Sequence, residues 1–123
     1  HETLADVERH LGDVAGELGV EVEFAQRNGE GELVECIQAL MGRADGALIN
    51  AGAYSHTSIA IHDAFRAVDV PFVEVHISNI FAREPERRHS TLASGALALL
   101  SGFGTYGYEL ALRGLVAKLT SRG

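Results

Sequence analysis

The chain has little of several features that mark particular classes of protein. It contains a single cysteine, Cys36, so no disulfide can form within it, and this usage fits a reducing cytoplasm. Its 10 lysine and arginine residues are outnumbered by 17 acidic ones, and the net charge of -7 argues against nucleic acid as the main partner. The longest apolar stretches, such as Ala96–Leu100, are far too short to span a membrane.

What remains is the composition of an ordinary globular protein, with 46% apolar and 22% charged residues. At 123 residues, we expect one domain over 1–123 with a continuous core. Helices are expected at about 4–18, 33–41, 57–68 and 106–119, and strands at 20–25, 46–50, 73–76 and 95–102. Because strands alternate with helices, the pattern favours a doubly wound α/β fold with a parallel sheet.

The start of the chain is unusual for such a fold. A doubly wound sheet of this size usually opens on a strand, whereas this chain opens on a helix, and His1 is not an initiator methionine. Without a neighbour, a strand at 20–25 would leave its backbone groups unpaired. We therefore expect a segment of about 20 residues, with the first strand, to precede His1 in the intact protein.

The segment from Val73 to Ile80 carries the most informative polar residues. An apolar, β-branched run ends there, and alternation along a strand points Glu74 and His76 to the same face. A carboxylate beside an imidazole orients the ring and favours its protonated form, which suits a general acid near neutral pH. A lone histidine at a strand end is more often structural, but this pairing favours a functional role.

A second polar segment, Asn50–Ser58, is expected between a buried strand and a helix. Open α/β sheets bind ligands at the carboxyl ends of their strands, which is where this segment lies. Asn50 offers both a donor and an acceptor, and His56 can donate to a hydroxyl. The alternative is a plain strand-to-helix turn in which Ser55 or Thr57 caps the helix.

Three arginines, Arg83, Arg87 and Arg88, follow the histidine strand. Such a run is usually a solvated face, or it pairs with neighbouring acids such as Glu84 and Glu86. Its place directly after the strand favours at least one arginine that faces an anionic ligand. A proton donor beside anion-binding groups predicts an active site for a small acidic substrate.

Other patterns carry less weight. Glu74, His56 and His76 are of metal-ligand type, but neither a helical His-x-x-x-His spacing nor a cysteine pair accompanies them, so we expect no metal site. The glycines of 102–107 match a dinucleotide fingerprint, yet no strand with an acidic ribose partner follows, and we predict a tight turn into the last helix. Asp63 is predicted on an outward helical face and is unremarkable alone.

Taken together, four segments resemble the type II 3-dehydroquinate dehydratases. The matching stretches, in that family's order and spacing, are Asn50–Ser58, Glu74–Asn79, Ala82–Ser90 and Gly102–Tyr108. The resemblance covers essentially the whole chain. It implies a flavodoxin-like fold, trimers assembled into a dodecamer, and neither a metal nor an organic cofactor. The implied reaction is the reversible dehydration of 3-dehydroquinate to 3-dehydroshikimate through an enolate, a lyase step of the shikimate pathway.

The resemblance also implies catalytic roles. His76 would be the general acid that protonates the departing hydroxyl, and Glu74 would hold its ring. Arg83 would lie near the base and favour its ionised form. In the family the base is a lid tyrosine, aided by a lid arginine and an early asparagine, and all three belong upstream of His1. Because neither Tyr54 nor Tyr106 matches that tyrosine, we expect the 123-residue chain alone to be unstable and nearly inactive.

Substrate binding is implied as well. The residues expected to bind substrate hydroxyls are Asn50, His56 and Arg87. The backbone amides of Ile77 and Ser78, with the Ser78 hydroxyl, would receive the substrate carboxylate. Asp63 would reach the active site of a neighbouring subunit, which would explain an acid on an outward face.

Two non-catalytic interpretations stay open at this point. The chain could be a flavodoxin-like binding domain, for a nucleotide or as a signalling receiver. A receiver needs a phosphoacceptor aspartate at a strand end, where this chain has Asn50 and His76 instead. It could also be an assembly component that kept the trimer surface and lost the base.

Overall fold

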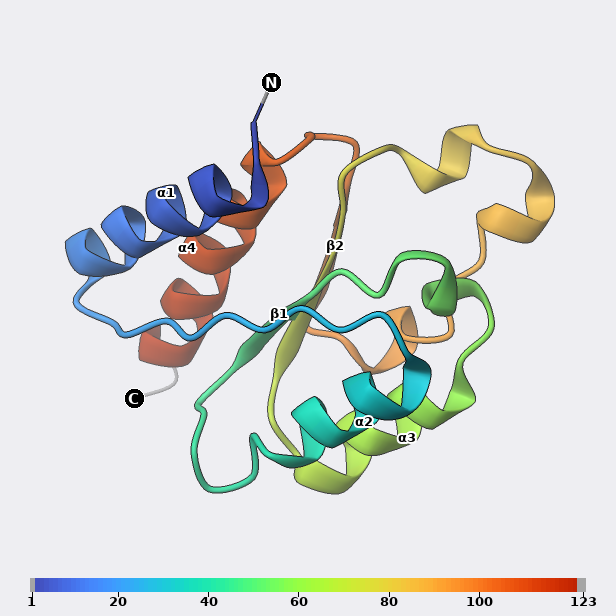
Figure 1. Cartoon of the computed structure of the whole chain (residues 1–123), viewed down its shortest axis with the longest axis horizontal. Coiled ribbons are helices and arrows are strands. Elements are labelled where there is room, and N and C mark those ends of the chain that lie inside the picture. The colour runs from blue at the N-terminus through green and yellow to red at the C-terminus, as the bar shows by residue number, and fades with distance from the viewer. Residues whose placement is uncertain (1, 122–123) are drawn as a thin grey trace.

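The computed structural model describes residues 2–121, in which helices and strands alternate along most of the chain (Figure 1). The strands are β1 (Ala47–Ile49), β2 (Phe72–His76) and β3 (Ala98–Ser101). The helices are α1 (Leu4–Leu18), α2 (Glu30–Gln38), α3 (Ile59–Val68) and α4 (Tyr106–Ser121). Short 3-10 turns are η1 (Gly52–His56), η2 (Ile80–Ala82), η3 (Pro85–Arg87) and η4 (Ala93–Gly95).

The three strands form a parallel sheet in the order β1-β2-β3. In its register Glu74 of β2 lies opposite both Ile49 of β1 and Leu99 of β3. Every residue of the central strand is buried. Because all strands run the same way, their carboxyl ends meet at one edge of the sheet, where the polar segments follow them.

Helices cover both faces of this sheet (Figure 1). On one face α1 packs beside α4, and Val73 and Val75 of β2 join Ala111 and Leu115 of α4 in one apolar cluster. On the other face α2 packs beside α3. The result is a three-layer α/β/α arrangement in which β2 forms the centre.

The side of β2 that faces α3 changes from apolar to polar along the strand. At its start, Phe72 stacks on Phe65 of α3 with ring centroids 3.9 Å apart. Alternation then brings Glu74 and His76 to this same side. Both are buried, with Glu74 0% and His76 5% exposed, so the end of the strand places a polar pair inside the protein.

The predicted helices are confirmed, with corrections at their ends. Thr3 and Asp6 form the capping box of α1, and Gly19 ends this helix in the left-handed region at φ 72°. The second helix stops at Gln38, three residues before the predicted end. The helix predicted from residue 57 begins at Ile59, and its cap is Ser58. Neither Ser55 nor Thr57 has that role, because the chain first forms the 3-10 turn η1.

Two predictions about strands were wrong in part. Residues 20–25 are not a strand, because no strand in the described part of the chain pairs with them, and the Val20 N–H donates to the Ala15 carbonyl at the end of α1 instead. Val20 and Val22 nevertheless pack on the apolar cluster between α1 and α4. The apolar residues of the alternating pattern are therefore partly buried, although no strand forms. The last strand is shorter than predicted and is not buried, since β3 has one neighbouring strand and Ala98 is exposed.

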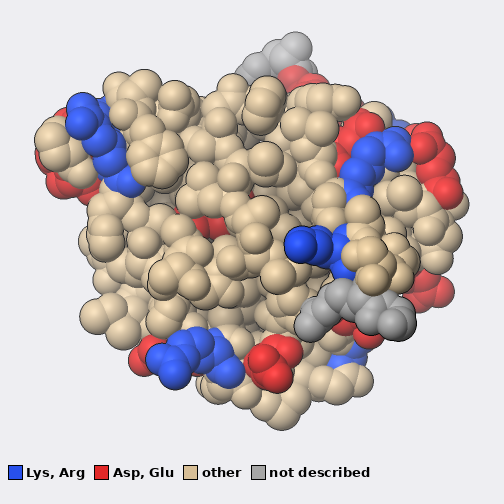
Figure 2. All heavy atoms as spheres, turned by 180° about the vertical axis from the view of Figure 1, so that it is seen from behind, with Lys and Arg blue, Asp and Glu red and all other residues tan. Residues whose placement is uncertain are grey.

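Charged groups at the surface are interspersed. On the face shown in Figure 2, the basic side chains lie in separate small groups, most of them beside acidic side chains. Within residues 2–121, no helix combines the length and the apolar character needed to cross a bilayer.

A polar cluster joins the two helices of the α1–α4 layer. Glu109 of α4 lies 2.5 Å from His10 Nε2 of α1 and 2.9 Å from Arg113 Nε. Arg113 also contacts Glu17 of α1 at 2.9 Å. The hydrogen bond from His10, followed by that from Arg113, lowers the pKa of Glu109 below its ordinary value of 4.5.

This cluster predicts an acid-sensitive contribution to stability. Since the pKa of Glu109 is lower in the folded protein, its stabilising effect is complete above about pH 4.5 and is lost as the pH falls below that value. We predict that Glu109→Gln lowers the urea midpoint at neutral pH and flattens its decline on acidification. Glu35→Gln, at an exposed α2 position, is the control. Equal acid-range slopes for the wild type and Glu109→Gln would contradict the prediction.

Candidate active site

The predicted polar residues meet at the carboxyl edge of the sheet. Asn50 follows β1 directly, His76 ends β2 and Ser101 ends β3. His56 comes from η1, the turn between β1 and α3. Parallel neighbouring strands thus bring residues that are far apart in sequence to one surface, as expected for a ligand site in an open α/β sheet.

The most deeply buried part of this site is the pair formed by Glu74 and His76. His76 Nε2 lies 2.5 Å from Glu74 Oε2, and the carboxylate can only accept, so Nε2 donates. The hydroxyl of Ser90 lies 2.8 Å from each carboxylate oxygen and donates to them. No hydrogen bond to His76 Nδ1 is found within residues 2–121, which leaves this nitrogen for a ligand. The predicted orientation of the pair is confirmed.

Asn50 is exposed and is held in one orientation by two neighbours. Its Oδ1 accepts from the backbone N–H of Gly52 at 3.0 Å, and its Nδ2 donates to the hydroxyl of Tyr108 at 2.9 Å. Gly52 has φ 58°, which glycine adopts at little cost. The amide therefore retains a second N–H for a ligand hydroxyl.

The orientation of His56 is fixed by a contact with the arginine-containing loop, residues 81–90. Its Nδ1 lies 2.6 Å from the carbonyl oxygen of His89. A carbonyl only accepts, so Nδ1 carries the proton and Nε2 of the neutral ring is an acceptor. His56 can therefore accept from a substrate hydroxyl, whereas the sequence had suggested a donor.

The segment after His76 offers polar groups to an anion. Arg83 donates to the hydroxyl of Ser78. Ser101 donates to the Ser78 carbonyl at 3.0 Å and accepts from the backbone N–H of Ile80 at 3.0 Å. Among residues 2–121, no turn or loop hydrogen bond uses the backbone N–H groups of Ile77 and Ser78. The Ser78 hydroxyl, which contacts the Arg83 guanidinium, and these two amides therefore belong to one exposed segment.

The other two arginines of this loop have different partners. Arg87 pairs with Glu84 at 2.8 Å, and both side chains are about half exposed, at 52% each. Arg88 Nε donates to the carbonyl oxygen of Arg83 at 2.5 Å. Arg87 thus adopts the alternative considered from the sequence, contact with a neighbouring acid, and Arg83 is the arginine beside Ser78.

Asp63 is exposed on α3. Its carboxylate lies 3.6 Å from Nδ1 of His62. The predicted outward position of this acid is therefore observed.

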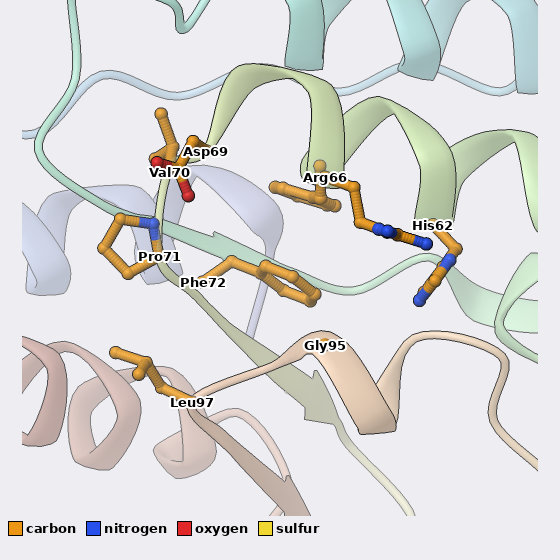
Figure 3. A pocket seen from close by; sticks show the side chains of 9 residues that line it. His62, Arg66, Asp69, Val70, Pro71, Phe72, Gly95 and Leu97 are labelled. Carbon is orange, nitrogen blue, oxygen red and sulfur yellow. The ribbon is translucent and has the colours of Figure 1, made fainter.

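A cavity lies away from the predicted site. It has a volume of about 420 Å³ and lies between α3 and the segments that lead into β2 and β3 (Figure 3). Its polar lining comes from His62, Arg66 and Asp69. Because it opens at the amino end of β2, its lining includes neither Glu74 nor His76. The described residues also contain no grouping of three or more histidine, cysteine or acidic side chains suited to a metal ion.

The supporting roles of three residues were not predicted from the sequence. Ser90 and Tyr108 lie within the segments that suggested the family, but nothing in their spacing showed that they would contact Glu74 and Asn50. Ser101 ends β3 and had no distinguishing pattern. Only the strand ends could have hinted at it, since a hydroxyl there lies beside the neighbouring strand.

The fold and this site define a class of protein. A parallel α/β sheet covered by helices on both faces, with an imidazole–carboxylate pair at its carboxyl edge, is the arrangement of an α/β enzyme that uses acid–base chemistry.

Comparison with known proteins gives the family. The model for "Dehydroquinase class II" matches residues 1–116. A 3-dehydroquinate dehydratase from Gemmatimonas aurantiaca is 56% identical over 117 residues, which cover 95% of this chain and 77% of that protein. A catabolic 3-dehydroquinase from Penicillium rubens is 49% identical over 112 residues, covering 91% and 72%. The chain belongs to the class II dehydroquinase family.

A solved structure agrees with this assignment. The type II dehydroquinase from Propionibacterium acnes superposes with a TM-score of 0.88 at 38% sequence identity, covering 94% of this chain and 79% of that one. The family resemblance and the flavodoxin-like fold expected from the sequence are both confirmed.

The two hydrogen bonds of Ser101 predict a measurable contribution to stability. We expect Ser101→Ala to lower the free energy of unfolding by about 1–2 kcal/mol, because it removes an acceptor for Ile80 and a donor to Ser78 in a partly buried place. Chemical denaturation measures this change. Ser94→Ala, at an exposed position, is the control. A decrease in the free energy of unfolding no larger than that of the control would show that these two hydrogen bonds do not stabilise the protein.

Proposed function

We propose that the full-length protein catalyses the reversible dehydration of 3-dehydroquinate to 3-dehydroshikimate, as a hydro-lyase of the shikimate pathway, with His76 as the general acid. Membership of the class II dehydroquinase family supports the reaction. The observation that carries the assignment of His76 is its 2.5 Å contact with a carboxylate that is 0% exposed, at the sheet edge where the other polar residues meet.

The chemistry requires two proton transfers. A base first removes a proton from the carbon next to the ketone, which leaves an enolate. The hydroxyl on the adjacent carbon then departs, and the electrons of the enolate form the new carbon–carbon double bond. This hydroxyl takes a proton and leaves as water. His76 Nδ1 is the proposed donor, because Nε2 is occupied by Glu74.

Substrate binding is proposed at the groups around this donor. Asn50, through its second N–H, and His56, through Nε2, would bind substrate hydroxyls. The Ile77 and Ser78 amides, with the Ser78 hydroxyl, would bind the carboxylate. The contact of Arg83 with Ser78 supports a cationic environment for that carboxylate and for an ionised base.

Arg87 is also proposed to bind a substrate hydroxyl. In this structure its guanidinium pairs with Glu84 at 2.8 Å. Because both side chains are half exposed, the pair is weakly held and Arg87 can exchange Glu84 for a ligand at little cost.

The base itself is not assigned to either tyrosine considered from the sequence. Tyr54 donates its hydroxyl to the backbone carbonyl of Asn28 at 3.1 Å. Tyr106 is 55% exposed at the start of α4. The proposed mechanism therefore assigns to the described residues the general acid and the binding of substrate, and leaves the first proton transfer to the family's lid tyrosine.

Removing the imidazole tests the central assignment. We predict that His76→Ala lowers kcat about 10²- to 10⁴-fold, the usual contribution of a general acid, while the protein stays folded and assembled. Turnover is followed by the rise in ultraviolet absorbance of the conjugated enone product formed by the full-length protein. His10→Ala, at an exposed α1 position, is the matched control. Undiminished turnover by His76→Ala would refute the role.

The same assay separates catalysis from the alternative of a non-catalytic binding or assembly domain. A folded wild-type protein that forms no product from 3-dehydroquinate, without added metal, would favour that alternative. The proposed location is the cytoplasm, which the free thiol of Cys36 supports.

Assembly into trimers, and of trimers into a dodecamer, is proposed with a role for Asp63 across the subunit contact. An exposed acid on α3, outside its own chain's polar cluster, supports this role. A subunit that carries Asp63→Ala and one that carries His76→Ala would each be impaired alone. In mixed oligomers we predict recovery of turnover, since an intact His76 then meets an intact Asp63 of the other subunit. No recovery on mixing would place Asp63 outside the neighbouring site.

A further inference from the structure

Ser90 contacts the buried carboxylate from the far end of the arginine-containing loop. Its Oγ lies 2.8 Å from Oε1 and 2.8 Å from Oε2 of Glu74. The same oxygen accepts from the backbone N–H groups of Leu92 at 3.1 Å and Ala93 at 3.2 Å. Because these two donors occupy the lone pairs of the hydroxyl, its single hydrogen is directed to the carboxylate.

The carboxylate depends on this hydroxyl. Glu74 is 0% exposed, and a buried charge is tolerated only when hydrogen-bond donors surround it. Within residues 2–121, the side-chain donors to its oxygens are His76 and Ser90. Without Ser90, one oxygen would face the interior without a donor, and the carboxylate would be free to rotate away from the imidazole.

The place of Ser90 is fixed by the next residue. Thr91 donates its backbone N–H to the Ser55 carbonyl at 2.7 Å and its hydroxyl to the Ser58 carbonyl at 2.9 Å. These contacts attach the end of the loop to η1 and the start of α3. Ser90 and Thr91 therefore contact both the Glu74–His76 pair and the turn that contains His56.

We propose that Ser90 is a positioning residue for the dehydration, which acts on His76 through Glu74. This role rests on the proposed function of His76 as the general acid. By holding both carboxylate oxygens, Ser90 fixes the direction of the Glu74–His76 hydrogen bond and hence the direction of Nδ1. Partners that orient a metal-binding histidine typically contribute about 10- to 100-fold to activity, and we expect a similar effect for a histidine that acts as an acid.

A double-mutant cycle on the full-length protein tests the proposal. Ser90→Ala is expected to lower kcat for 3-dehydroquinate by about 10- to 100-fold with little change in KM, because it displaces the acid and not the binding groups. Ser90→Thr, which keeps the hydroxyl, should restore most of kcat. In a Glu74→Gln background, Ser90→Ala should change kcat by no more than about twofold, since the group through which it acts is already altered.

A purely structural role gives a different result. If Ser90 only caps the turn at Leu92 and Ala93, Ser90→Ala lowers kcat by the same factor in both backgrounds, which would overturn the proposal. Wild-type kcat in Ser90→Ala would overturn it as well. Failure of the proposed function would be seen separately, as absent wild-type turnover or as full activity of His76→Ala. Ser94→Ala, in the nearby turn η4 and exposed, controls for loss of a serine hydroxyl.

Discussion

A charge placed at the centre of the sheet is the constraint on which the rest of this structure depends. Glu74 lies in the middle of the central strand, with a neighbouring strand on each side and no exposure to solvent. Transfer of a carboxylate from water to such a place is strongly unfavourable unless donors replace the water. Here hydrogen bonds from His76 and Ser90 replace it. The buried charge and the geometry of the site therefore depend on the same three side chains.

Polar segments before and after β2 in the chain orient the other groups of the site. The turn η1 follows β1 and carries His56, and the loop after β2 returns to that turn through Thr91 and His89. Asn50 is held from the opposite direction by Tyr108 of α4. Each ligand-facing group thus has a second contact that fixes its orientation. Such preorganisation lowers the cost of ordering these groups when substrate binds.

Short-range patterns predicted much of this. Alternation along β2 was sufficient to place Glu74 and His76 together, and the α/β pattern was sufficient to place Asn50 near His76. The alternating residues 20–25 gave the same kind of signal without forming a strand, because pairing depends on a neighbour that periodicity does not specify. The contact of Ser90 with Glu74 could not be predicted for a related reason. This contact depends on the path of an irregular loop. That path is set by hydrogen bonds from the backbone N–H and the hydroxyl of Thr91.

The loop between β2 and η4 is fixed at its two ends and exposed in the middle. Ser101 holds its beginning, and Ser90 and Thr91 hold its end, while residues 81–89 are all exposed. A loop closed at both ends tolerates changes in its middle at small entropic cost, because its end-to-end distance is already fixed. The side chains that meet a ligand's outer groups can therefore vary without disturbing the proton donor beneath them.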